Sequence, residues 1–341
     1  MDEKITIKDV ARLAGVSLGT ASRVVNGAPS VTQSVRDRVE RAIAQLGYKP
    51  NIMAQSMRGG NTRTIGIMIR SITIPTLARF VRAVQDVLQA AGYTLLITCS
   101  EDHPKRELEL LGLMSERRVD GMIMTTCSES NAELAAARKN MRLPLVLLDR
   151  PANEYADSVL LDHYEGMMRA INHLVSLNHR RIALITGSSD VYPGRERLRA
   201  YRDAVAAGLI EDDPKLVRAK AFDSATAFVE TSAVLGISTP PTAILIGGID
   251  MLPGSLRSIR ARKLRIPGDL SVIGAADSDL AMLLEPAISV VRWDYAELGI
   301  SCANLLLERI AAAGQPFTPR EIMYPTELLV RESCAPVPRT D

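Results

Sequence analysis

The chain has 341 residues, too many for one ordinary hydrophobic core, so its length predicts two or three domains. With 47 % apolar and 23 % charged residues, the composition is that of a soluble globular protein and excludes a disordered chain. Residues 1–63 contain ten basic and five acidic residues, whereas the remainder contains 31 basic and 34 acidic ones. The excess positive charge therefore lies at the amino-terminal end, as expected if only that end meets a polyanion, although a solvated basic tail has a similar composition.

The four cysteines are far apart and form no CxxC pair, so the sequence indicates neither a disulfide framework nor a zinc site. The first residues, MDEKITIKDV, lack the apolar core of a signal peptide, and no run of about 18 apolar residues occurs. We therefore expect a cytoplasmic protein with reduced thiols, no membrane-spanning segment, no metal and no other cofactor. The cysteines are Cys99, Cys127, Cys302 and Cys334.

Three short helices are predicted near the amino terminus. The first begins at Thr6, whose hydroxyl can cap it while Asp9 completes a capping box. Gly15 stands where a left-handed turn residue fits, and Ser17 is a good N-cap for the second helix. The third runs from Thr32 to Gly47. Two helices of about eight residues joined by a tight glycine turn are typical of a helix-turn-helix unit.

The second helix is predicted to present a mostly polar face. A helix with such a face fits the major groove of DNA, with its amino-terminal residues at the base edges. A small helical bundle with an ordinary solvated face is the alternative that these residues alone leave open. The outward residues are Ser17, Leu18, Gly19, Thr20, Ser22 and Arg23.

Residues 51–58, NIMAQSMR, predict a further short helix on which Ala54, Gln55 and Met57 share a face, followed by a Gly-Gly-Asn joint. A helix of about eight residues is unstable alone in water because nucleation is costly. It should therefore form only where a partner and DNA supply contacts. A plain linker is the alternative.

From Arg63 onward, apolar runs alternate with helical stretches, which predicts βαβ units and parallel sheets. The length of this part favours two α/β lobes with a cleft at the carboxyl ends of their strands. The predicted strands are 65–69, 94–98, 122–124, 145–148, 182–186, 243–246 and 270–274. The predicted helices are 77–91, 105–117, 164–177, 197–207, 225–235, 251–262 and 294–313.

The stretch TIKDVARLAGVSLGTASRVVN at 6–26 and LGYKPN at 46–51 closely resemble the DNA-binding headpiece of the lactose-repressor (LacI) family. The body also resembles this family over nearly its whole length. Its landmarks include ERRVDGMI at 116–123, LDR at 148–150, HLVSLNHRRIALITG at 173–187, RIPGDLSVIG at 265–274 and ELLVRES at 327–333.

The resemblance implies an all-α helix-turn-helix headpiece at 1–49, a hinge helix and linker at 50–62, and a periplasmic-binding-protein-like body at 63–333. The body's N-lobe would use about 63–161 and 292–321, its C-lobe about 162–291 and 322–333, and 334–341 would be a tail. The resemblance also implies a homodimer that binds near-palindromic operator DNA and is controlled by a small-molecule effector. Repression is favoured over activation on this resemblance alone.

The resemblance assigns DNA contacts to the headpiece and to the hinge, where Met57 takes the place of the family's usual leucine wedge in the minor groove. Leu18 and Gly19 stand where the family usually has base-reading polar side chains, so the operator sequence cannot be deduced. The expected DNA-binding residues are Thr6, Ser17, Leu18, Gly19, Thr20, Ser22, Arg23, Asn26, Tyr48, Asn51, Ala54, Gln55 and Met57.

In the predicted cleft, the resemblance assigns effector contacts to Asp149, Arg197 and Phe222. Two departures from the family pattern are Gly248-Ile249, where Asn-Asp is usual, and Ala276, where an aspartate is usual. Because acids are lost while arginines remain, the sequence favours a sugar acid or another anionic metabolite, with a neutral sugar next. The expected effector-binding residues are Arg70, Ser71, Asp149, Arg195, Arg197, Phe222, Gly248 and Asp277.

No enzyme motif occurs: the histidines form no HExxH, and neither a G-x-S-x-G elbow nor a GxxxxGK[ST] loop is present. We therefore do not expect catalysis. A periplasmic solute-binding protein would share the body fold but not the headpiece, and an architectural DNA binder would lack the cleft.

Overall fold

The computed structural model describes residues 5–25, 30–48 and 61–337 and divides the chain into two units, Met1–Thr62 and Arg63–Asp341. Most of the predicted hinge helix and linker lies outside the described residues. Five of the predicted DNA contacts lie outside them too, namely Asn26, Asn51, Ala54, Gln55 and Met57.

The first unit, the headpiece, contains the three predicted helices α1 (Ile7–Ala14), α2 (Leu18–Val25) and α3 (Gln33–Leu46). The Asp9 carboxylate accepts hydrogen bonds from the backbone nitrogen of Thr6 at 3.0 Å and from its hydroxyl at 2.7 Å. Gly15 follows α1 with φ +62°, the left-handed conformation predicted for it. The helix-turn-helix prediction is therefore confirmed.

Small apolar side chains hold the headpiece together. Ala11 and Ala21 are buried on α1 and α2, which lets the two helices approach closely. Val10 and Val39 are fully buried between the helices, and half-buried Val16 packs against them from the turn. The headpiece is thus built around a single small apolar core.

The second unit, the body, contains two lobes. The N-lobe is built on a six-stranded parallel sheet in the order β11-β5-β4-β3-β1-β2. Its strands are β1 (Thr64–Ile69), β2 (Thr94–Cys99), β3 (Gly121–Met124), β4 (Leu145–Leu148), β5 (Asp157–Leu161) and β11 (Glu321–Tyr324). Its helices are α5 (Pro75–Ala90), α6 (Pro104–Glu116), α7 (Ala132–Asn140) and α13 (Tyr295–Ala311).

The C-lobe repeats this plan with a sheet in the order β12-β10-β9-β8-β6-β7. Its strands are β6 (Ile182–Gly187), β7 (Val217–Lys220), β8 (Ala243–Ile246), β9 (Ser271–Ala275), β10 (Ser289–Arg292) and β12 (Glu327–Leu329). Its α-helices are α8 (His163–Ser176), α9 (Tyr192–Ala206), α10 (Ser224–Leu235), α11 (Leu252–Ala261) and α12 (Asp279–Leu283). The predicted parallel sheets are confirmed, and the edge strand β12, which runs antiparallel to β10, is the one exception among the described strands.

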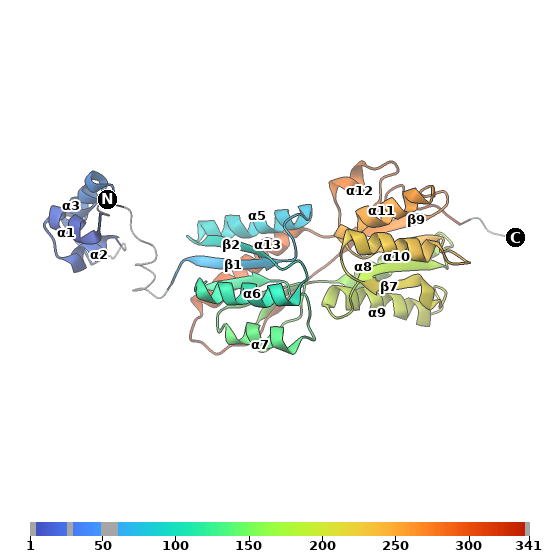
Figure 1. Cartoon of the computed structure of the whole chain (residues 1–341), viewed down its shortest axis with the longest axis horizontal. Helices are drawn as coiled ribbons and strands as arrows, with labels where there is room; N and C mark the ends of the chain where they lie inside the picture. The colour runs from blue at the N-terminus through green and yellow to red at the C-terminus, as the bar shows by residue number, and fades with distance from the viewer. Residues whose placement is uncertain (1–4, 26–29, 49–60, 338–341) are drawn as a thin grey trace. The chain divides into compact units, whose positions relative to one another are not determined.

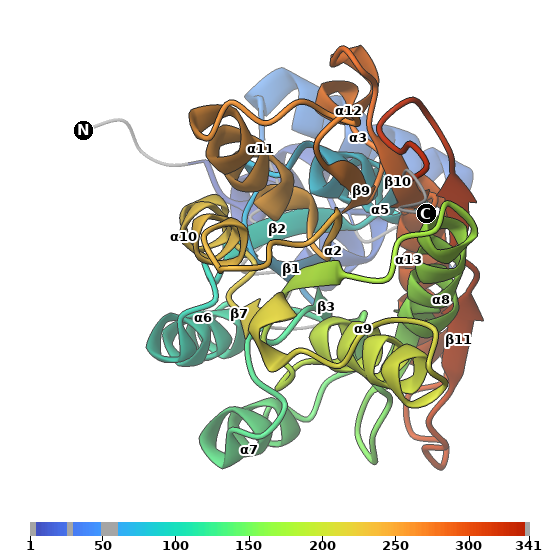
Figure 2. The same ribbon diagram turned by 90° about the vertical axis from the view of Figure 1, so that its right-hand side faces the viewer.

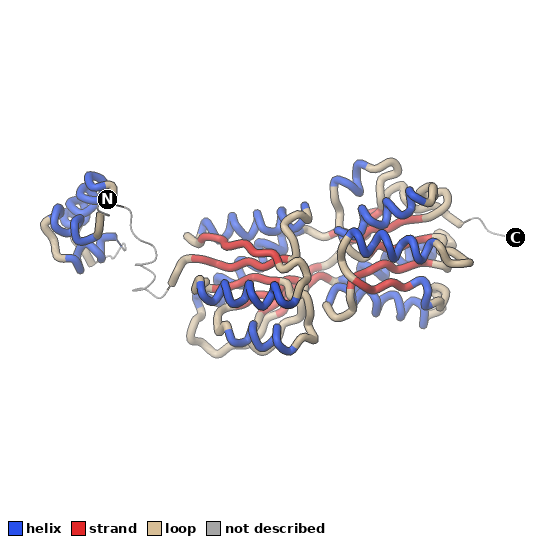
Figure 3. Tube along the Cα trace, viewed as in Figure 1, coloured by secondary structure: helices blue, strands red, loops and turns tan. Residues whose placement is uncertain are grey.

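Alternate strand residues face opposite sides of each sheet, and helices cover both sides. In the N-lobe, Ile65 and Ile67 pack toward α5 and α13, whereas Met68 packs toward α6 and α7. In the C-lobe, Leu184 packs toward α8 and α9, whereas Ile185 packs toward α10 and α11. The strands in Figure 3 accordingly lie between layers of helices, and Figure 2 separates α8 and α9 from α10 and α11.

The chain passes between the lobes three times, after β5, after β10 and after β11 (Figure 1). Residues that follow β1, β3 and β4 in one lobe and β6, β7 and β8 in the other line one common cavity. The carboxyl ends of the parallel strands therefore meet at a cleft between the lobes, as predicted for such sheets.

The sequence missed several elements, and their composition explains why. Strands β7, β11 and β12 lie at sheet edges and carry polar residues, so they show no buried apolar run. The short helix α12 and the polar helix α7 have too little apolar periodicity to be recognised. Strands β5 and β10 are buried but only five and four residues long, and runs this short show no clear period.

Three expected boundaries are corrected. Helix α9 begins at Tyr192 rather than at 197, because Pro193 is tolerated in a first helical turn, where no backbone donor is needed. Residues 322–324 belong to the N-lobe, since β11 pairs with β5. The expected tail is held to the C-lobe as far as Val337, whose nitrogen donates to the Leu177 carbonyl oxygen at 2.9 Å. In the described part of the chain, no helix is long and apolar enough to cross a membrane.

Close packing of α10 on α11 requires glycine at 254. A Cβ there would lie 1.9 Å from the carbonyl oxygen of Ser224, so the two helices would have to separate. We expect Gly254→Ala to destabilise the body by about 1–3 kcal/mol, which thermal unfolding of the full chain would show as a lower Tm.

The matched control is Gly112→Ala on exposed α6, where an added Cβ has nothing within 4 Å. This variant should be stabilised by about 0.5–1 kcal/mol, because alanine loses less conformational freedom in a helix than glycine. Equal Tm values for the two variants would contradict the packing argument.

Candidate functional site

Helix α2 carries five of the eight described residues that were predicted to meet DNA, and a sixth, Ser17, directly precedes it. The Ser17 hydroxyl accepts a hydrogen bond from the Thr20 nitrogen at 3.1 Å, and their hydroxyl oxygens are 2.9 Å apart. These two side chains fix the first turn of the helix. Leu18, Gly19 and Arg23 are exposed beside them, and Ser22 is half-buried. The side chains with most freedom to reach a duplex are therefore those of Leu18 and Arg23.

Two further predicted DNA residues have structural contacts in the headpiece. The hydroxyl of Thr6 donates to Asp9, and this hydrogen bond lowers the pKa of the Asp9 carboxyl below its usual value. Tyr48 is half-buried and packs against the headpiece core. Their part in DNA binding stays a prediction.

The interlobe cleft contains a cavity of about 300 Å³, at the small end of the range for ligand pockets. Five of the eight predicted effector residues line it: Arg70, Asp149, Arg197, Phe222 and Gly248. This cavity is called the cleft cavity below. The sequence missed most of its other walls, which include Asp102, Thr125, Cys127, Arg150, Ser188, Lys220, Trp293 and Tyr295.

A buried hydrogen-bonded chain joins the two lobes beside the cleft cavity. The Nε2 of His163, at the start of α8, lies 2.8 Å from the carboxylate of Asp149, which follows β4. The Nδ1 of the same ring lies 3.0 Å from Nη2 of Arg197 on α9. Because an arginine can only donate, Nδ1 must accept and Nε2–H must donate to Asp149. His163 is thus held as one neutral tautomer.

Burial explains the electrostatics of this chain. Desolvation lowers the pKa of Arg197 to about 10 and, together with Arg197, lowers the pKa of His163. Burial alone would raise the pKa of Asp149, but His163, Arg150 and Arg197 outweigh it and hold the pKa below its usual value. A neutral histidine between an anion and a cation is therefore the stable state. Asp149 also has φ +55°, a conformation that aspartate tolerates better than most residues.

Phe222 lies against backbone rather than over open space. A Cβ on Gly187 would come within 2.0 Å of its ring, and a Cβ on Gly248 within 2.9 Å. The ring also stacks 5.8 Å below the Arg197 guanidinium. The glycine at 248, where the family usually has asparagine, therefore makes room for the aromatic ring.

Arg70 forms an ion pair across the cleft. Its Nη2 lies 2.9 Å from the Asp250 carboxylate, which belongs to the turn after β8 in the C-lobe, and its Nε lies 3.7 Å from Asp102. The expectation that the acids of this region are lost is thus corrected, because Asp250 supplies one two residues beyond Gly248. Sequence position alone could not reveal a partner 180 residues away.

The other predicted effector residues lie outside the cleft cavity. Ser71 is buried, with its hydroxyl 2.9 Å from that of Thr73. Arg195 pairs with Glu129 of the N-lobe at 2.8 Å. Arg70, Arg195 and Arg197 were expected to be free to bind an effector. This expectation is corrected, because each of them has a protein partner.

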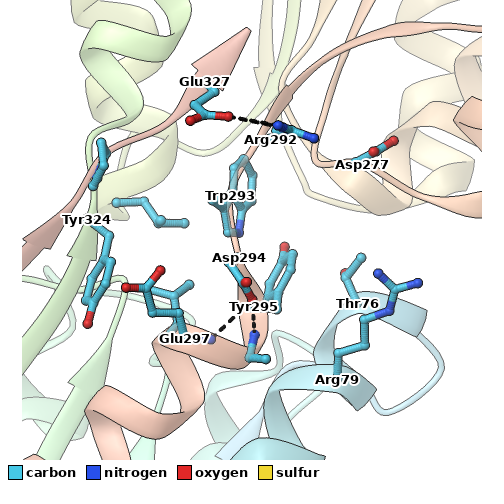
Figure 4. A pocket seen from close by; sticks show the side chains of 14 residues that line it. Thr76, Arg79, Asp277, Arg292, Trp293, Asp294, Tyr295, Glu297, Tyr324 and Glu327 are labelled. Atoms are coloured by element: carbon cyan, nitrogen blue, oxygen red, sulfur yellow. Dashed lines mark hydrogen bonds and ion pairs between the residues drawn. The ribbon is translucent and has the colours of Figure 1, made fainter. Parts of the chain in front are cut away.

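The eighth residue, Asp277, lines a second cavity of about 460 Å³ beside the segments that connect the lobes (Figure 4). It pairs with Arg331 at 2.8 Å. The figure also shows the Arg292–Glu327 pair, at 3.0 Å, and Asp294 capping α13. Because five of the eight predicted effector residues line the cleft cavity and only Asp277 lines this one, we regard the cleft cavity as the better candidate for the effector. Among residues 5–25, 30–48 and 61–337, no cluster of three or more His, Cys, Asp or Glu could hold a metal ion.

A helix-turn-helix headpiece joined to a two-lobed α/β body with a ligand-sized cleft defines a ligand-responsive DNA-binding regulator. Residues 6–51 match the bacterial regulatory proteins of the lacI family, and residues 171–334 match the periplasmic binding protein-like domain. With the full-length similarities that follow, the chain belongs to the lacI family, and it is a DNA-binding transcriptional repressor rather than an enzyme.

Among curated proteins, the chain is 32 % identical to the HTH-type transcriptional repressor PurR of Aliivibrio fischeri (strain MJ11), covering 89 % of this chain and 91 % of that protein. It is 31 % identical to the ribose operon repressor of Haemophilus influenzae, with 96 % and 98 % covered. Among solved structures, it is similar to the lac repressor dimer bound to operator and the anti-inducer ONPF, with a TM-score of 0.82 and 27 % identity over 98 % of this chain and 100 % of that one.

The neutral state of His163 has a consequence for stability. The pKa of His163 is lowered in the folded chain, so below about pH 6.5 the unfolded chain binds a proton that the folded chain does not. The stability of the folded chain therefore decreases as the pH is lowered. His163→Asn keeps a donor for Asp149 and an acceptor for Arg197 but does not titrate. When the pH is lowered from 7.5 to 5.5, the Tm of this variant should fall less than that of the wild type. The corresponding difference in the free energy of unfolding is at most about 1.4 kcal/mol per pH unit.

His173 and His179 also have lowered pKa values because of burial, so the His163→Asn variant keeps part of the dependence. A variant as pH-sensitive as the wild type would refute the neutral His163.

Proposed function

We propose that two copies of the chain bind a near-palindromic operator in the cytoplasm, with each α2 in a major groove, and that an anionic metabolite in the cleft cavity controls this binding. A sugar acid is the favoured effector. The hinge helices of the dimer would order on the operator, and a change in the body would release them.

The charge of the cavity wall carries the choice of an anionic effector. Four cations line the cleft cavity, against two carboxylates, Asp102 and Asp149. Lys220 at the end of β7 is exposed, and Arg150 donates through Nε to the Thr126 carbonyl oxygen at 3.0 Å, which fixes its place in the wall. A small carboxylated ligand would meet a net positive surface there. The cations are Arg70, Arg150, Arg197 and Lys220.

A neutral sugar is the second candidate. The carboxylate of Asp149 can accept hydrogen bonds from sugar hydroxyl groups, and the guanidinium of Arg197 can donate hydrogen bonds to them. Phe222 offers an apolar face to a sugar ring. The relative named as a ribose operon repressor favours this candidate. The two candidate effectors differ in how much Arg70 contributes to their binding, because only an anionic effector is strongly attracted by the Arg70 guanidinium.

Calorimetric titration of the full chain tests the effector class. D-Galacturonate, D-glucuronate and D-gluconate should bind, and D-galactose and D-glucose should bind at least about tenfold more weakly. Arg70→Gln should weaken acid binding by about tenfold or more. Arg82→Gln, which removes an exposed arginine of α5, should not. Tight binding of a neutral sugar without any acid would reject the anionic effector.

The headpiece proposal is tested at Arg23. An operator would first be selected from bound genomic fragments, and gel shifts would then compare wild type with Arg23→Ala. If Arg23 reads a guanine, the loss should be about 1–3 kcal/mol and sequence preference should relax. If it grips a phosphate, all sequences should weaken alike.

Arg41→Ala removes the same charge from exposed α3 and controls for general electrostatic attraction. Equal, sequence-independent losses in both variants would contradict a specific role for α2. Failure of the full chain to prefer any genomic fragment, even at low ionic strength and with metabolites present, would reject operator binding altogether.

A further inference from the structure

We propose that the Asp250 carboxylate occupies the position on Arg70 that the effector's anionic group would take. Asp250 and Arg70 would then together set the specificity of the cleft for acids. This inference rests on the proposed anionic effector and adds the residue that competes with it. An effector carboxylate would take the place of the Asp250 carboxylate on the Arg70 guanidinium. Its binding would then exchange an interlobe ion pair for a ligand contact.

The geometry places the pair at the edge of the cleft cavity. Arg70 follows β1 of the N-lobe and lines the cavity, as does Ile249, the neighbour of Asp250 in the turn after β8 of the C-lobe. The side chain of Arg70 is 17 % exposed and that of Asp250 is 33 % exposed. The guanidinium therefore reaches the cavity while its charge is balanced from the opposite lobe.

The pair is strong enough to form and weak enough to be replaced. Only one hydrogen bond, from Nη2 at 2.9 Å, joins Arg70 to Asp250, so the bidentate geometry that makes such pairs strong is not used. An ion pair that is partly exposed contributes little net stability. An effector carboxylate that formed two parallel bonds to the same guanidinium would have the advantage.

The surroundings favour an incoming anion over a neutral group. Lys220 lies on the opposite wall, and Asp102 is 3.7 Å from Arg70, too far for a direct hydrogen bond. The Asp102 side chain is also 40 % exposed, so water screens its interaction with Arg70. Asp250 is then the principal internal competitor. A neutral sugar gives Arg70 no charge in return and should leave the pair intact.

The exchange also explains how ligand chemistry would reach the lobes. Asp250 belongs to the C-lobe and Arg70 to the N-lobe, so displacing Asp250 removes one interlobe tie on the cleft side. Other interlobe ties, such as Arg195 with Glu129, need not change. An acid and a neutral sugar of the same size would therefore leave the body with different interlobe contacts.

The test compares Asp250→Asn with the wild-type full chain by calorimetry, using the matched pairs D-galacturonate with D-galactose and D-glucuronate with D-glucose. Asp250→Asn keeps the size of the side chain and removes its charge. It should bind at least one of the two acids about tenfold more tightly than the wild type, equivalent to 1.4 kcal/mol, with less than about a twofold change for the neutral sugars.

Three control variants distinguish an anion-binding position on Arg70 from a general change in the lobes. Asp279→Asn removes another interlobe partner, that of Arg79 at 3.7 Å, away from the cleft cavity, and should leave acid affinity within about twofold. Asp250→Glu restores the carboxylate and should return acid affinity toward the wild-type value. Combining Asp250→Asn with Arg70→Gln should abolish the gain.

The proposal is overturned if Asp250→Asn binds no acid more tightly than the wild type, or if Asp279→Asn shows an equal gain. Failure of the anionic effector itself has a different signature, because the wild type would then bind a neutral sugar and no acid. In that case, if only Asp250→Asn gains acid binding, the result still supports an anion-binding position on Arg70 that Asp250 occupies in the wild type.

Discussion

The site depends on one constraint: the parallel strands of both lobes end at a common cleft, and three chain crossings keep the lobes beside each other. Side chains that follow strand ends have no further sheet to join, so they meet across the cleft. The Asp149–His163–Arg197 chain exists only because the two lobes are in contact, since Asp149 comes from one and the other two residues from the other. The proposed ligand binding and the lobe contact would therefore depend on the same few side chains.

Buried charges around the cleft are held by partners, which keeps the cavity walls in place. Glu107 is fully buried, and its carboxylate accepts from the Thr126 hydroxyl at 2.7 Å, the Cys127 nitrogen at 2.8 Å and Arg138 at 3.1 Å. An unpaired buried carboxylate would be costly, so these bonds form together and fix the loop after β3 against the cavity. In contrast, the Arg70–Asp250 pair is partly exposed and has a single hydrogen bond. The wall thus combines a fixed part with an exchangeable one.

Local patterns predicted the headpiece and most of the inner strands, because the Gly15 turn and the buried apolar runs depend on residues that are neighbours in the sequence. Asp149 was predicted to follow a strand, and it does. The edge strands β7, β11 and β12 were missed because a strand with one open edge and polar residues has no distinctive period. The partners of Arg70 and Asp149 were missed for another reason: Asp250 and His163 are brought to them by the pairing of the lobes. Residue types at strand ends identify candidates, but only the fold decides which of them have partners.

Strand β1 connects the cleft to the start of the body. Its six residues, in a central position between β2 and β3, span about 20 Å at the usual rise of an extended chain. Arg70 follows its carboxyl end, while at its amino end the Arg63 nitrogen donates to Asp120 at 2.8 Å and the Arg63 guanidinium stacks 5.1 Å from the ring of Tyr93. A strand paired on both sides cannot bend freely, so a shift at Arg70 must be shared with its neighbours or carried to Arg63. The residue that would bind the effector's charge and the first residue of the body thus flank opposite ends of the same strand.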